Sequence, residues 1–317
     1  MHGAAEVVGG SKAAVVRAKA ALAAGDHAGA LAELRAAIRP EDDFTEQARI
    51  ARAFAKVDAG ALGLRPLKVA VLAGSTVDHL ADVLRFWLAV SGFAAEIYLA
   101  PYDTAAQTVL DPASGLYAFA PQVVWLFSTH RDAGVAVEPG TSAAEVEAAV
   151  EAAVAERTAL WQVLAERLDA LVLQNNADIP ADDPFGNLAG AAPWGMRTAL
   201  RLYNARLAAA ASAGATVFDL DHVAGLWGRA RWTDPRYWHH SKHAFAPDAT
   251  GVVAAAASRL LAGAMGLARK CLVLDLDNTL WGGVIGDDGV AGIALGTGAD
   301  GEAFVAFQRH VKALKER

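Results

Sequence analysis

Cysteine is almost absent from this sequence of 317 residues, in which the one thiol belongs to Cys271. A chain with one cysteine forms no intrachain disulfide, and proteins without disulfides are typical of a reducing compartment. We therefore expect a cytoplasmic protein. Because Cys271 stands in an apolar run, we interpret it as a small core residue rather than as a nucleophile.

Long hydrophobic runs are also missing. No uninterrupted apolar stretch reaches the roughly 18–20 residues that a membrane-spanning helix needs. The alanine-rich start of the chain contains Lys12, Arg17 and Lys19, and these charges interrupt the apolar region that a signal peptide requires. The sequence therefore predicts neither a signal peptide nor a membrane partner.

An excess of positive charge is lacking as well. The formal net charge is -7, whereas nucleic-acid-binding domains usually carry a basic face. We therefore expect no nucleic-acid partner. Charged residues make up 20% and hydrophobic residues 54% of the chain, which favours a folded globular protein over a disordered one. The length is sufficient for two domains.

The first part of the chain shows helical patterns. One helical face collects Ala14, Val15, Ala18, Ala21 and Leu22, with the spacing of an amphipathic helix. A second helix is predicted over 28–38, and a third begins after 43. We interpret residues 1–62 as a helical N-terminal segment that covers the following domain.

From residue 67 onward, strands alternate with helices. Apolar runs predict strands at 67–73, 93–100, 122–128, 170–174 and 215–220. Helices are predicted at 77–90, at 141–168 with a capping box from Ser142 to Glu145, at about 194–212, and at 247–267. This alternation is typical of a parallel sheet with helices on both faces. Residues 63–268 therefore form an α/β domain of the flavodoxin-like type.

An acidic pair follows the last predicted strand. Residues 271–274 are apolar and predict a short buried strand, and Asp275 and Asp277 come directly after it. Carboxylates this close stay ionised when a cation lies between them, and Mg²⁺ prefers oxygen ligands. The pattern predicts a metal site at Asp275 and Asp277. A solvated acidic turn is the alternative.

The stretch from Asp275 to Leu280, with its continuation from Trp281 to Gly289, resembles motif I of the haloacid dehalogenase (HAD) superfamily. The Trp-Gly-Gly-Val-Ile-Gly continuation is similar to the FkbH-like branch, which supplies glycerate-derived units to acyl carrier proteins in polyketide pathways. The resemblance implies that residues 269–317 begin a HAD-type, Rossmann-like domain. A helix is predicted over 301–317.

The resemblance also implies roles for individual residues. Asp275 would be the nucleophile toward a phosphoryl group, Asp277 the general acid and base, and both would hold Mg²⁺. Substrate contacts and a flap would come from Thr279, Trp281, Gly282 and Gly283. The implied reaction dephosphorylates 1,3-bisphosphoglycerate and transfers the glyceryl unit to the phosphopantetheine thiol of an acyl carrier protein.

The later HAD motifs find no match in the 47 residues from Cys271 to Arg317. They comprise a Ser or Thr, a Lys and a second acidic pair. We therefore expect the HAD-type domain to be truncated here, and the chain as given to be inactive without those motifs. A non-catalytic module that docks a carrier protein is an alternative function.

The α/β domain resembles the SGNH hydrolases. In that family a serine follows the first strand, an asparagine donates to the oxyanion, and a late segment supplies the acid and the base. The matching positions are Ser75, Asn175 and His243, but Ala246 stands where the base belongs. The resemblance therefore implies a degenerate SGNH-like scaffold, with a working esterase as an alternative. Ser75 could also simply cap the helix over 77–90.

Residues 227–243 are rich in aromatic and basic side chains. Arginine and histidine bind phosphate, and tryptophan, tyrosine and arginine anchor protein interfaces. Substrate contact, carrier-protein docking and an ordinary loop over the sheet edge all remain open for this stretch. Its histidines lack acidic or cysteine partners at ligand spacing, so a zinc site is not expected.

Overall fold

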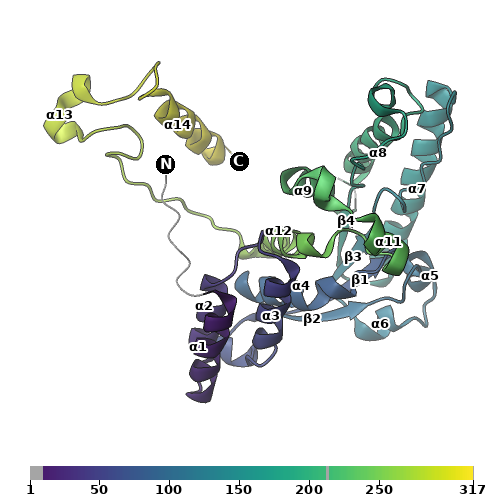
Figure 1. Ribbon diagram of the computed structural model, residues 1–317, viewed down its shortest axis with the longest axis horizontal. Coiled ribbons are helices and arrows are strands. Elements are labelled where there is room, and N and C mark those ends of the chain that lie inside the picture. Colours follow the sequence, from purple (N-terminus) through teal and green to yellow (C-terminus); the bar gives the residue numbers. More distant parts are fainter. Residues whose placement is uncertain (1–9, 212–213, 317) are drawn as a thin grey trace. The chain divides into compact units, whose positions relative to one another are not determined.

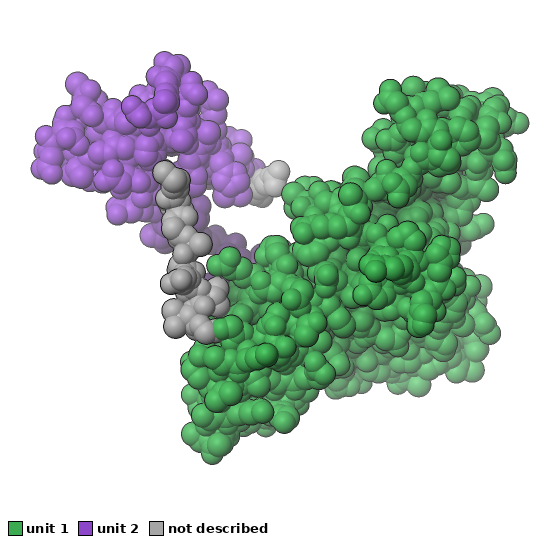
Figure 2. All heavy atoms as spheres, in the orientation of Figure 1, with its two compact units in different colours: residues 1–267 green, residues 268–317 purple. Residues whose placement is uncertain are grey.

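A computed structural model describes residues 10–211 and 214–316 of the chain. The chain forms two compact units, one up to Leu267 and one from Ala268 onward (Figure 2). Each unit is described by itself below.

The first unit is built on a five-stranded parallel sheet (Figure 1). Its strands are β1 (Arg65–Ala73), β2 (Phe93–Leu99), β3 (Val123–Phe127), β4 (Leu171–Asn175) and β5 (Thr216–Phe218). The strand order is β2-β1-β3-β4-β5, and every neighbouring pair is parallel. This is the flavodoxin-like order of doubly wound α/β proteins. The predicted α/β class and the parallel sheet are confirmed.

Both faces of the sheet are buried, which explains why its central strands are apolar without alternation. All five residues of β3 are buried. In β1, Val69 and Val71 pack on one side, and Ala70 and Leu72 on the other. The sheet therefore needs a helical layer on each face.

Helices supply the two layers. One face packs against α4 (Asp78–Val90), α12 (Thr250–Ala262) and α9 (Leu220–Trp227). The N-terminal helices α1 (Ser11–Ala23), α2 (His27–Ala36) and α3 (Phe44–Phe54) pack on the outside of this layer, where α3 contacts α4 and α12. The other face packs against α5 (Ala105–Leu110), α6 (Gly115–Phe119), α7 (Ala143–Arg167) and α8 (Met196–Ala211). Shorter elements are α10 (Arg229–Trp232), α11 (Pro235–Ser241), η1 (Gly60–Leu62), η2 (Gly186–Gly190), η3 (Pro247–Ala249) and η4 (Gly263–Leu267).

The N-terminal helices share the core of the sheet instead of standing apart from it. Gln47 of α3 is buried, its Nε2 donates to the carbonyl of Arg39 at 2.7 Å, and its Oε1 accepts from Nε1 of Trp87 at 3.1 Å. Because Trp87 belongs to α4, this side chain ties the helical segment to the sheet domain.

One stretch among the described residues is long and apolar enough to cross a membrane, from Pro247 to Leu267. It contains α12, whose Val253, Ala254 and Leu261 are buried in the core of the first unit. Core packing accounts for the apolar character of this helix.

The second unit differs from the prediction at its start. Residues 271–274 form no strand, Val273 is 89% exposed, and Cys271 is also exposed. The predictions of a buried strand and of a core cysteine are therefore wrong. A strand needs neighbours that accept and donate its backbone hydrogen bonds, and between residues 268 and 316 the structure describes no strand that could pair with this run. Helices α13 (Ile285–Gly292) and α14 (Glu302–Lys315) follow.

Candidate functional site

The carboxyl ends of β1, β3 and β4 converge at one edge of the sheet. The strand order reverses between β1 and β3, and such switch points hold ligands in open α/β sheets. The turn after β1 lies against the loop after β3, because a Cβ added to Gly74 would stand 2.3 Å from Oδ1 of Asp132. Only glycine allows this close approach. Chemistry in the first unit is therefore expected at this edge.

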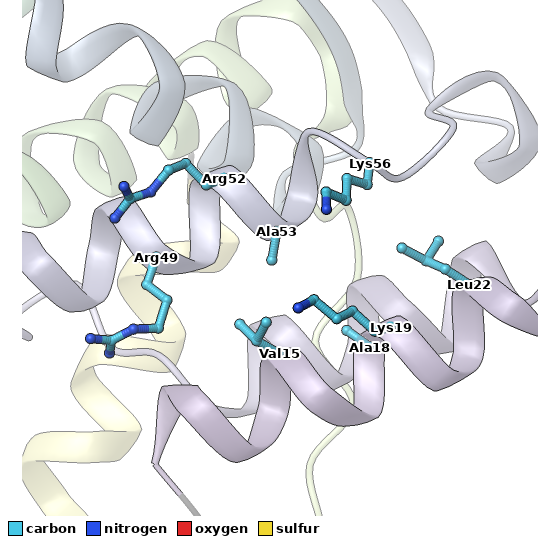
Figure 3. A pocket seen from close by; sticks show the side chains of 8 residues that line it. All are labelled: Val15, Ala18, Lys19, Leu22, Arg49, Arg52, Ala53 and Lys56. Carbon is cyan, nitrogen blue, oxygen red and sulfur yellow. The ribbon is translucent and has the colours of Figure 1, made fainter.

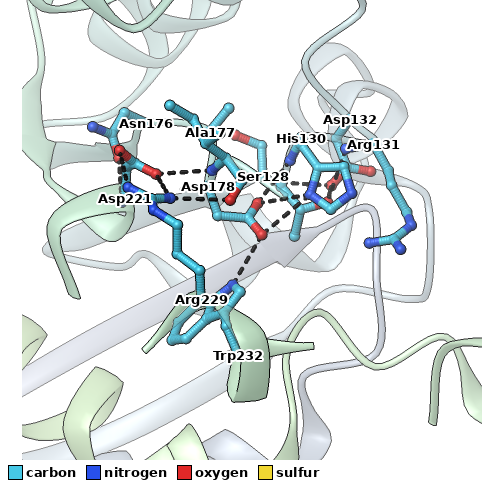
Figure 4. A network of polar contacts seen from close by, with 12 residues as sticks. Ser128, His130, Arg131, Asp132, Asn176, Ala177, Asp178, Asp221, Arg229 and Trp232 are labelled. Carbon is cyan, nitrogen blue, oxygen red and sulfur yellow. Dashed lines mark hydrogen bonds and ion pairs between the residues drawn. The ribbon is translucent and has the colours of Figure 1, made fainter. Parts of the chain in front are cut away.

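Asp178, which follows β4, is the centre of a polar network at this edge (Figure 4). Its side chain is fully buried. Oδ1 accepts from the backbone N–H of His130 at 2.8 Å, and both oxygens lie 3.1 Å from Nδ1 of His130. Oδ2 also accepts from Nε1 of Trp232 at 2.9 Å. The network joins the loops after β3 and β4 to α10.

Burial alone would raise the pKa of the Asp178 carboxyl, but the hydrogen bonds and the charge of His130, with the bond from Trp232, hold it below its usual value. An ionised Asp178 fixes Nδ1 of His130 as the donor. Within the described residues, the Nε2 atom of His130 has no hydrogen-bond partner, and the side chain of His130 is 13% exposed. This is the arrangement in which a buried carboxylate orients an imidazole.

An ion pair between Arg229 and Asp221 extends the network. Arg229 binds Asp221 through two hydrogen bonds, at 2.5 and 2.9 Å, and donates to the carbonyl of Ile179 at 3.0 Å. Asp221 also accepts from the backbone of Ile179 at 2.8 Å. The side-chain hydrogen bonds that Arg229 donates to Asp221 raise the pKa of Arg229. Residues 227–243 thus hold the sheet edge together, and they form two short helices where an ordinary loop was one interpretation.

Asn175 ends β4 and is fully buried. Its Oδ1 accepts from Nε1 of Trp125 at 3.2 Å and from the backbone of Ser128 at 3.1 Å. Its Nδ2 donates to the carbonyl oxygens of Ser128 and Asn176. Every polar atom of this side chain has a partner inside the protein, so Asn175 braces β3 against β4 in this structure.

His243 lies beside the turn after β1, because residues Thr76 and His243 form a β-bridge. Its Nδ1 contacts Nδ1 of His79 at 3.1 Å. Burial, and then the charge of His243, lowers the pKa of His79 to about 3. Burial also lowers the pKa of His243. The structure thus pairs His243 with a second imidazole.

This imidazole pair predicts a loss of stability in acid. The unfolded chain binds a proton at His79 below about pH 6.5, whereas the folded protein resists it down to about pH 3. The contribution of neutral His79 to the free energy of unfolding is therefore complete above about pH 6.5, and it is lost as the pH falls toward 3. One pKa unit corresponds to about 1.4 kcal/mol, so acidification from pH 6.5 to 4.5 costs about 2–3 kcal/mol through His79.

Urea unfolding at both pH values measures this loss. The His79→Gln variant is expected to lose less stability on acidification than the natural protein does. The exposed His222 offers a control, since His222→Gln should keep the natural pH dependence. Equal losses in His79→Gln and the natural protein contradict the assignment.

Ser75, the predicted remnant of a nucleophile, is 3% exposed, and its Oγ is buried without a hydrogen-bond partner. It does not cap the following helix, because α4 begins at Asp78 after Val77 and without a side-chain cap. A serine nucleophile must reach its substrate and a base, and Ser75 does neither in this structure.

We therefore predict that a fluorophosphonate probe leaves Ser75 unlabelled. Mass spectrometry of the tryptic peptide that contains residues 69–85 measures the labelling, and a serine esterase treated in parallel serves as the positive control. Stoichiometric modification of Ser75 that disappears in Ser75→Ala would restore the esterase interpretation.

The acidic pair of the second unit lies in a loop that is closed by its own hydrogen bonds. Asp275 is exposed, and its Oδ1 accepts from the backbone of Leu276 at 2.8 Å. Asp277 is half-buried, and its Oδ1 accepts from Nε1 of Trp281 at 3.0 Å and from the backbone of Ile285 at 3.1 Å. One carboxylate is thus open to solvent while the other anchors the following segment.

The predicted flap residues close this loop. Asn278 adopts a left-handed conformation with a φ of 54°, and its Oδ1 accepts from the backbone of Gly283 at 2.9 Å. Gly283 has a φ of 96°, which favours glycine, and an added Cβ would lie 2.7 Å from Oδ2 of Asp288. Gly282 pairs with Ala294. Half-buried Thr279 and Trp281 lie in the same loop.

The donor set is compatible with Mg²⁺. Within residues 10–211 and 214–316, no group of three His, Cys, Asp or Glu side chains gathers at ligand distance. Mg²⁺ in proteins commonly uses one or two carboxylates and keeps several waters. Within these residues, one carboxylate oxygen of Asp275 and one of Asp277 have no hydrogen-bond partner. The carboxylate of Asp275 and the backbone carbonyl of Asp277 offer oxygen, which is the hard donor that Mg²⁺ prefers.

Sequence reasoning missed the His130–Asp178 pair. His130 comes three residues after β3, and Asp178 comes three residues after β4. Adjacent parallel strands bring such positions to the same edge, so this spacing was a usable signal. The contribution of Trp232, from a segment more than fifty residues further along, had no signal in the sequence.

Comparison with known proteins decides the family. The model of the family described as FkbH, N-terminal domain, matches residues 68–262, which is more than half of the chain. The chain belongs to the FkbH family. A comparison with curated proteins gives no match.

Solved structures add a phosphatase relative. One is the N-terminal part of BF1531 from Bacteroides fragilis, which contains a phosphatase domain complexed with Mg. It is 25% identical in sequence, with a TM-score of 0.70. The match covers 87% of this FkbH-family chain and 71% of the BF1531 chain.

Two hydrolases share less. A lipase/acylhydrolase from Enterococcus faecalis (14% identity, TM-score 0.40) covers 63% of this chain and 97% of its own. LAE5 is an α/β hydrolase from the metagenome of Lake Arreo, Spain (13% identity, TM-score 0.36), and the match covers 65% of this chain and 98% of the LAE5 chain. Likenesses this low carry no inference about the chemistry of the FkbH-family chain.

Proposed function

We propose that this FkbH-family protein is a phosphatase and glyceryl transferase. Its substrate is a phosphorylated glycerate, 1,3-bisphosphoglycerate, and the product is a glyceryl thioester on an acyl carrier protein in polyketide biosynthesis. The thiol of the carrier attacks the C1 carbonyl and displaces the 1-phosphate, and the protein removes the 3-phosphoryl group, which leaves as inorganic phosphate after hydrolysis. One observation carries the proposal: the Asp275-x-Asp277 loop, closed by its own hydrogen bonds, occurs in a chain of this family. The Mg-bound phosphatase domain of the BF1531 relative supports it.

The geometry of the loop suggests separate roles for the two acids. Asp275 is exposed, with one oxygen bonded to the backbone of Leu276, and its free oxygen would attack phosphorus and receive the phosphoryl group. Asp277 is held by Trp281 and Ile285, and its second oxygen would donate a proton to the leaving oxygen. Mg²⁺, held by Asp275 and the backbone carbonyl of Asp277, would neutralise phosphoryl charge when bound.

Mass spectrometry of the carrier protein tests this function. The protein as the cell makes it is incubated with Mg²⁺, a system that generates 1,3-bisphosphoglycerate, and purified carrier proteins encoded beside its gene. We expect one carrier to gain the mass of a glyceryl group on its phosphopantetheine arm. A reaction without the enzyme is the control for spontaneous acylation.

Two results would contradict the proposal in different ways. If phosphate is released and no carrier gains mass, the protein is a phosphatase without the transfer step. If neither occurs while a carrier still binds, the docking-module alternative gains support.

A further inference from the structure

A groove of about 360 Å³ lies between α1 and the C-terminal half of α3 (Figure 3). Its floor is formed by the side chains of Val15, Ala18, Leu22 and Ala53. Small side chains at the floor let another backbone come close, and an apolar floor between two helices is the usual setting for a helix that lies in a groove.

The rim of the groove is cationic. Four basic side chains line it, namely Lys19, Arg49, Arg52 and Lys56. Figure 3 shows the ammonium ends of Lys19 and Lys56 in the gap between the two helices. Such a cluster stands out in a chain with 35 acidic and 28 basic residues.

Most of this charge is not neutralised by the residues that the structure describes. Arg49 forms an ion pair with Glu46 and also donates to Ser11. Lys19, Arg52 and Lys56 are exposed, and in the described part of the chain no acidic side chain pairs with them. The Nε of Arg52 donates only to a backbone carbonyl. Three free cations therefore flank the apolar floor.

The chemistry of the groove selects among partners. A nucleic acid would meet the three cations but would also approach a protein with a net charge of -7, which opposes the binding of a long polyanion. A membrane surface needs a broad apolar face, whereas this floor is narrow and enclosed by charge. An amphipathic helix that presents carboxylates on both sides of an apolar stripe matches both the floor and the rim.

We propose that this cationic groove docks an acidic helix of the acyl carrier protein. The identity of the partner rests on the proposed function, whereas the need for a carboxylate-bearing helix follows from the groove itself. Docking at α1 and α3 gives the N-terminal helices a role that the sheet domain and the acidic loop do not supply.

Isothermal titration of the 317-residue chain with purified, phosphopantetheine-bearing carrier proteins tests the docking surface. The double variant Lys19→Glu, Lys56→Glu is expected to weaken Kd at least about tenfold, since each reversal replaces an attraction by a repulsion. The exposed Lys12 lies on α1 outside the groove, so Lys12→Glu should change Kd less than about twofold. Binding should also weaken between 50 and 300 mM salt (about 14 and 6 Å Debye length).

Unchanged affinity in the double variant overturns the proposal, as does an equal loss in Lys12→Glu or the absence of any carrier binding. Binding of DNA or anionic vesicles in place of carriers, abolished by the same reversals, also overturns it. Thermal unfolding confirms that each variant is folded. The glyceryl-loading assay tests the proposed function separately. If the double variant is loaded with an unchanged KM for the carrier, the docking proposal is wrong and the proposed function is unaffected.

Discussion

In the protein as the cell makes it, replacing Asp275 with Asn is expected to abolish glyceryl loading and the release of phosphate from 3-phosphoglycerate. The change keeps the shape of the side chain and removes the nucleophile, and losses of about 10⁴-fold or more follow when a nucleophile is deleted. The exposed position of Asp275 predicts that folding is unaffected. Phosphate release and carrier mass are the two measurements. Asp287, an exposed acid on α13, provides the control Asp287→Asn.

The effect of replacing Asp277 with Asn should depend on the type of substrate. Asp277→Asn removes a proton donor, and proton donation contributes about 10²–10⁴-fold. Cleavage of an acyl phosphate at phosphorus releases a stable carboxylate. It needs this proton less than the cleavage of a phosphate ester, which releases an alkoxide. The loss of phosphate release should therefore be smaller with a simple acyl phosphate such as acetyl phosphate than with an ester such as 3-phosphoglycerate. Equal losses with both substrates would contradict the assigned role of Asp277, while full activity of Asp275→Asn would contradict the mechanism.

Replacing Asp178 with Ala is expected to destabilise the first unit by about 3–5 kcal/mol, since each buried donor left without an acceptor costs about 1–3 kcal/mol. The change leaves the backbone and Nδ1 of His130 and the indole N–H of Trp232 without their acceptor. Unpaired buried donors carry most of this cost. Urea unfolding followed by tryptophan fluorescence measures the free energy of unfolding.

A matched control is the exposed Asp169, for which Asp169→Ala should cost less than about 0.5 kcal/mol. Since the pKa of Asp178 is lowered, its contribution is present above about pH 3.9 and is lost as the pH falls further. The Asp178→Ala variant should therefore be less sensitive to acid in that range. A loss below about 1 kcal/mol at pH 7 would show that the network is not what holds the sheet edge together.

The sequence by itself determined the five strands and the longer helices of the first unit, whereas α5, α6 and α9 to α11 were not predicted. Its five apolar runs became the five strands, and the capping box of Ser142 and Glu145 begins α7 as expected. The end of β5 differs, because Asp219 accepts from the backbone of His222 and starts α9, so that Leu220 is helical. Local hydrogen-bonding chemistry is readable from sequence because its partners lie three or four residues apart.

The sequence by itself also predicted the family and the acidic loop. The segment from Asp275 to Gly283 closes through short-range bonds from Asp277 and Asn278, and such bonds need no distant partner. The apolar run before this loop was wrongly predicted to be a buried strand, since Val273 is exposed. An apolar run specifies a strand only where neighbouring strands are present to pair with it.

Only the tertiary structure decided which polar residues meet at the sheet edge. Asn175 and His243 occupy the predicted places, yet Asn175 has all its partners inside the protein and His243 contacts His79. Asp178, unremarkable in sequence, lies among His130 and Trp232. The physical reason is that these groups come from segments far apart in the chain, and the parallel strand order and burial, not local pattern, set their distances and their pKa values.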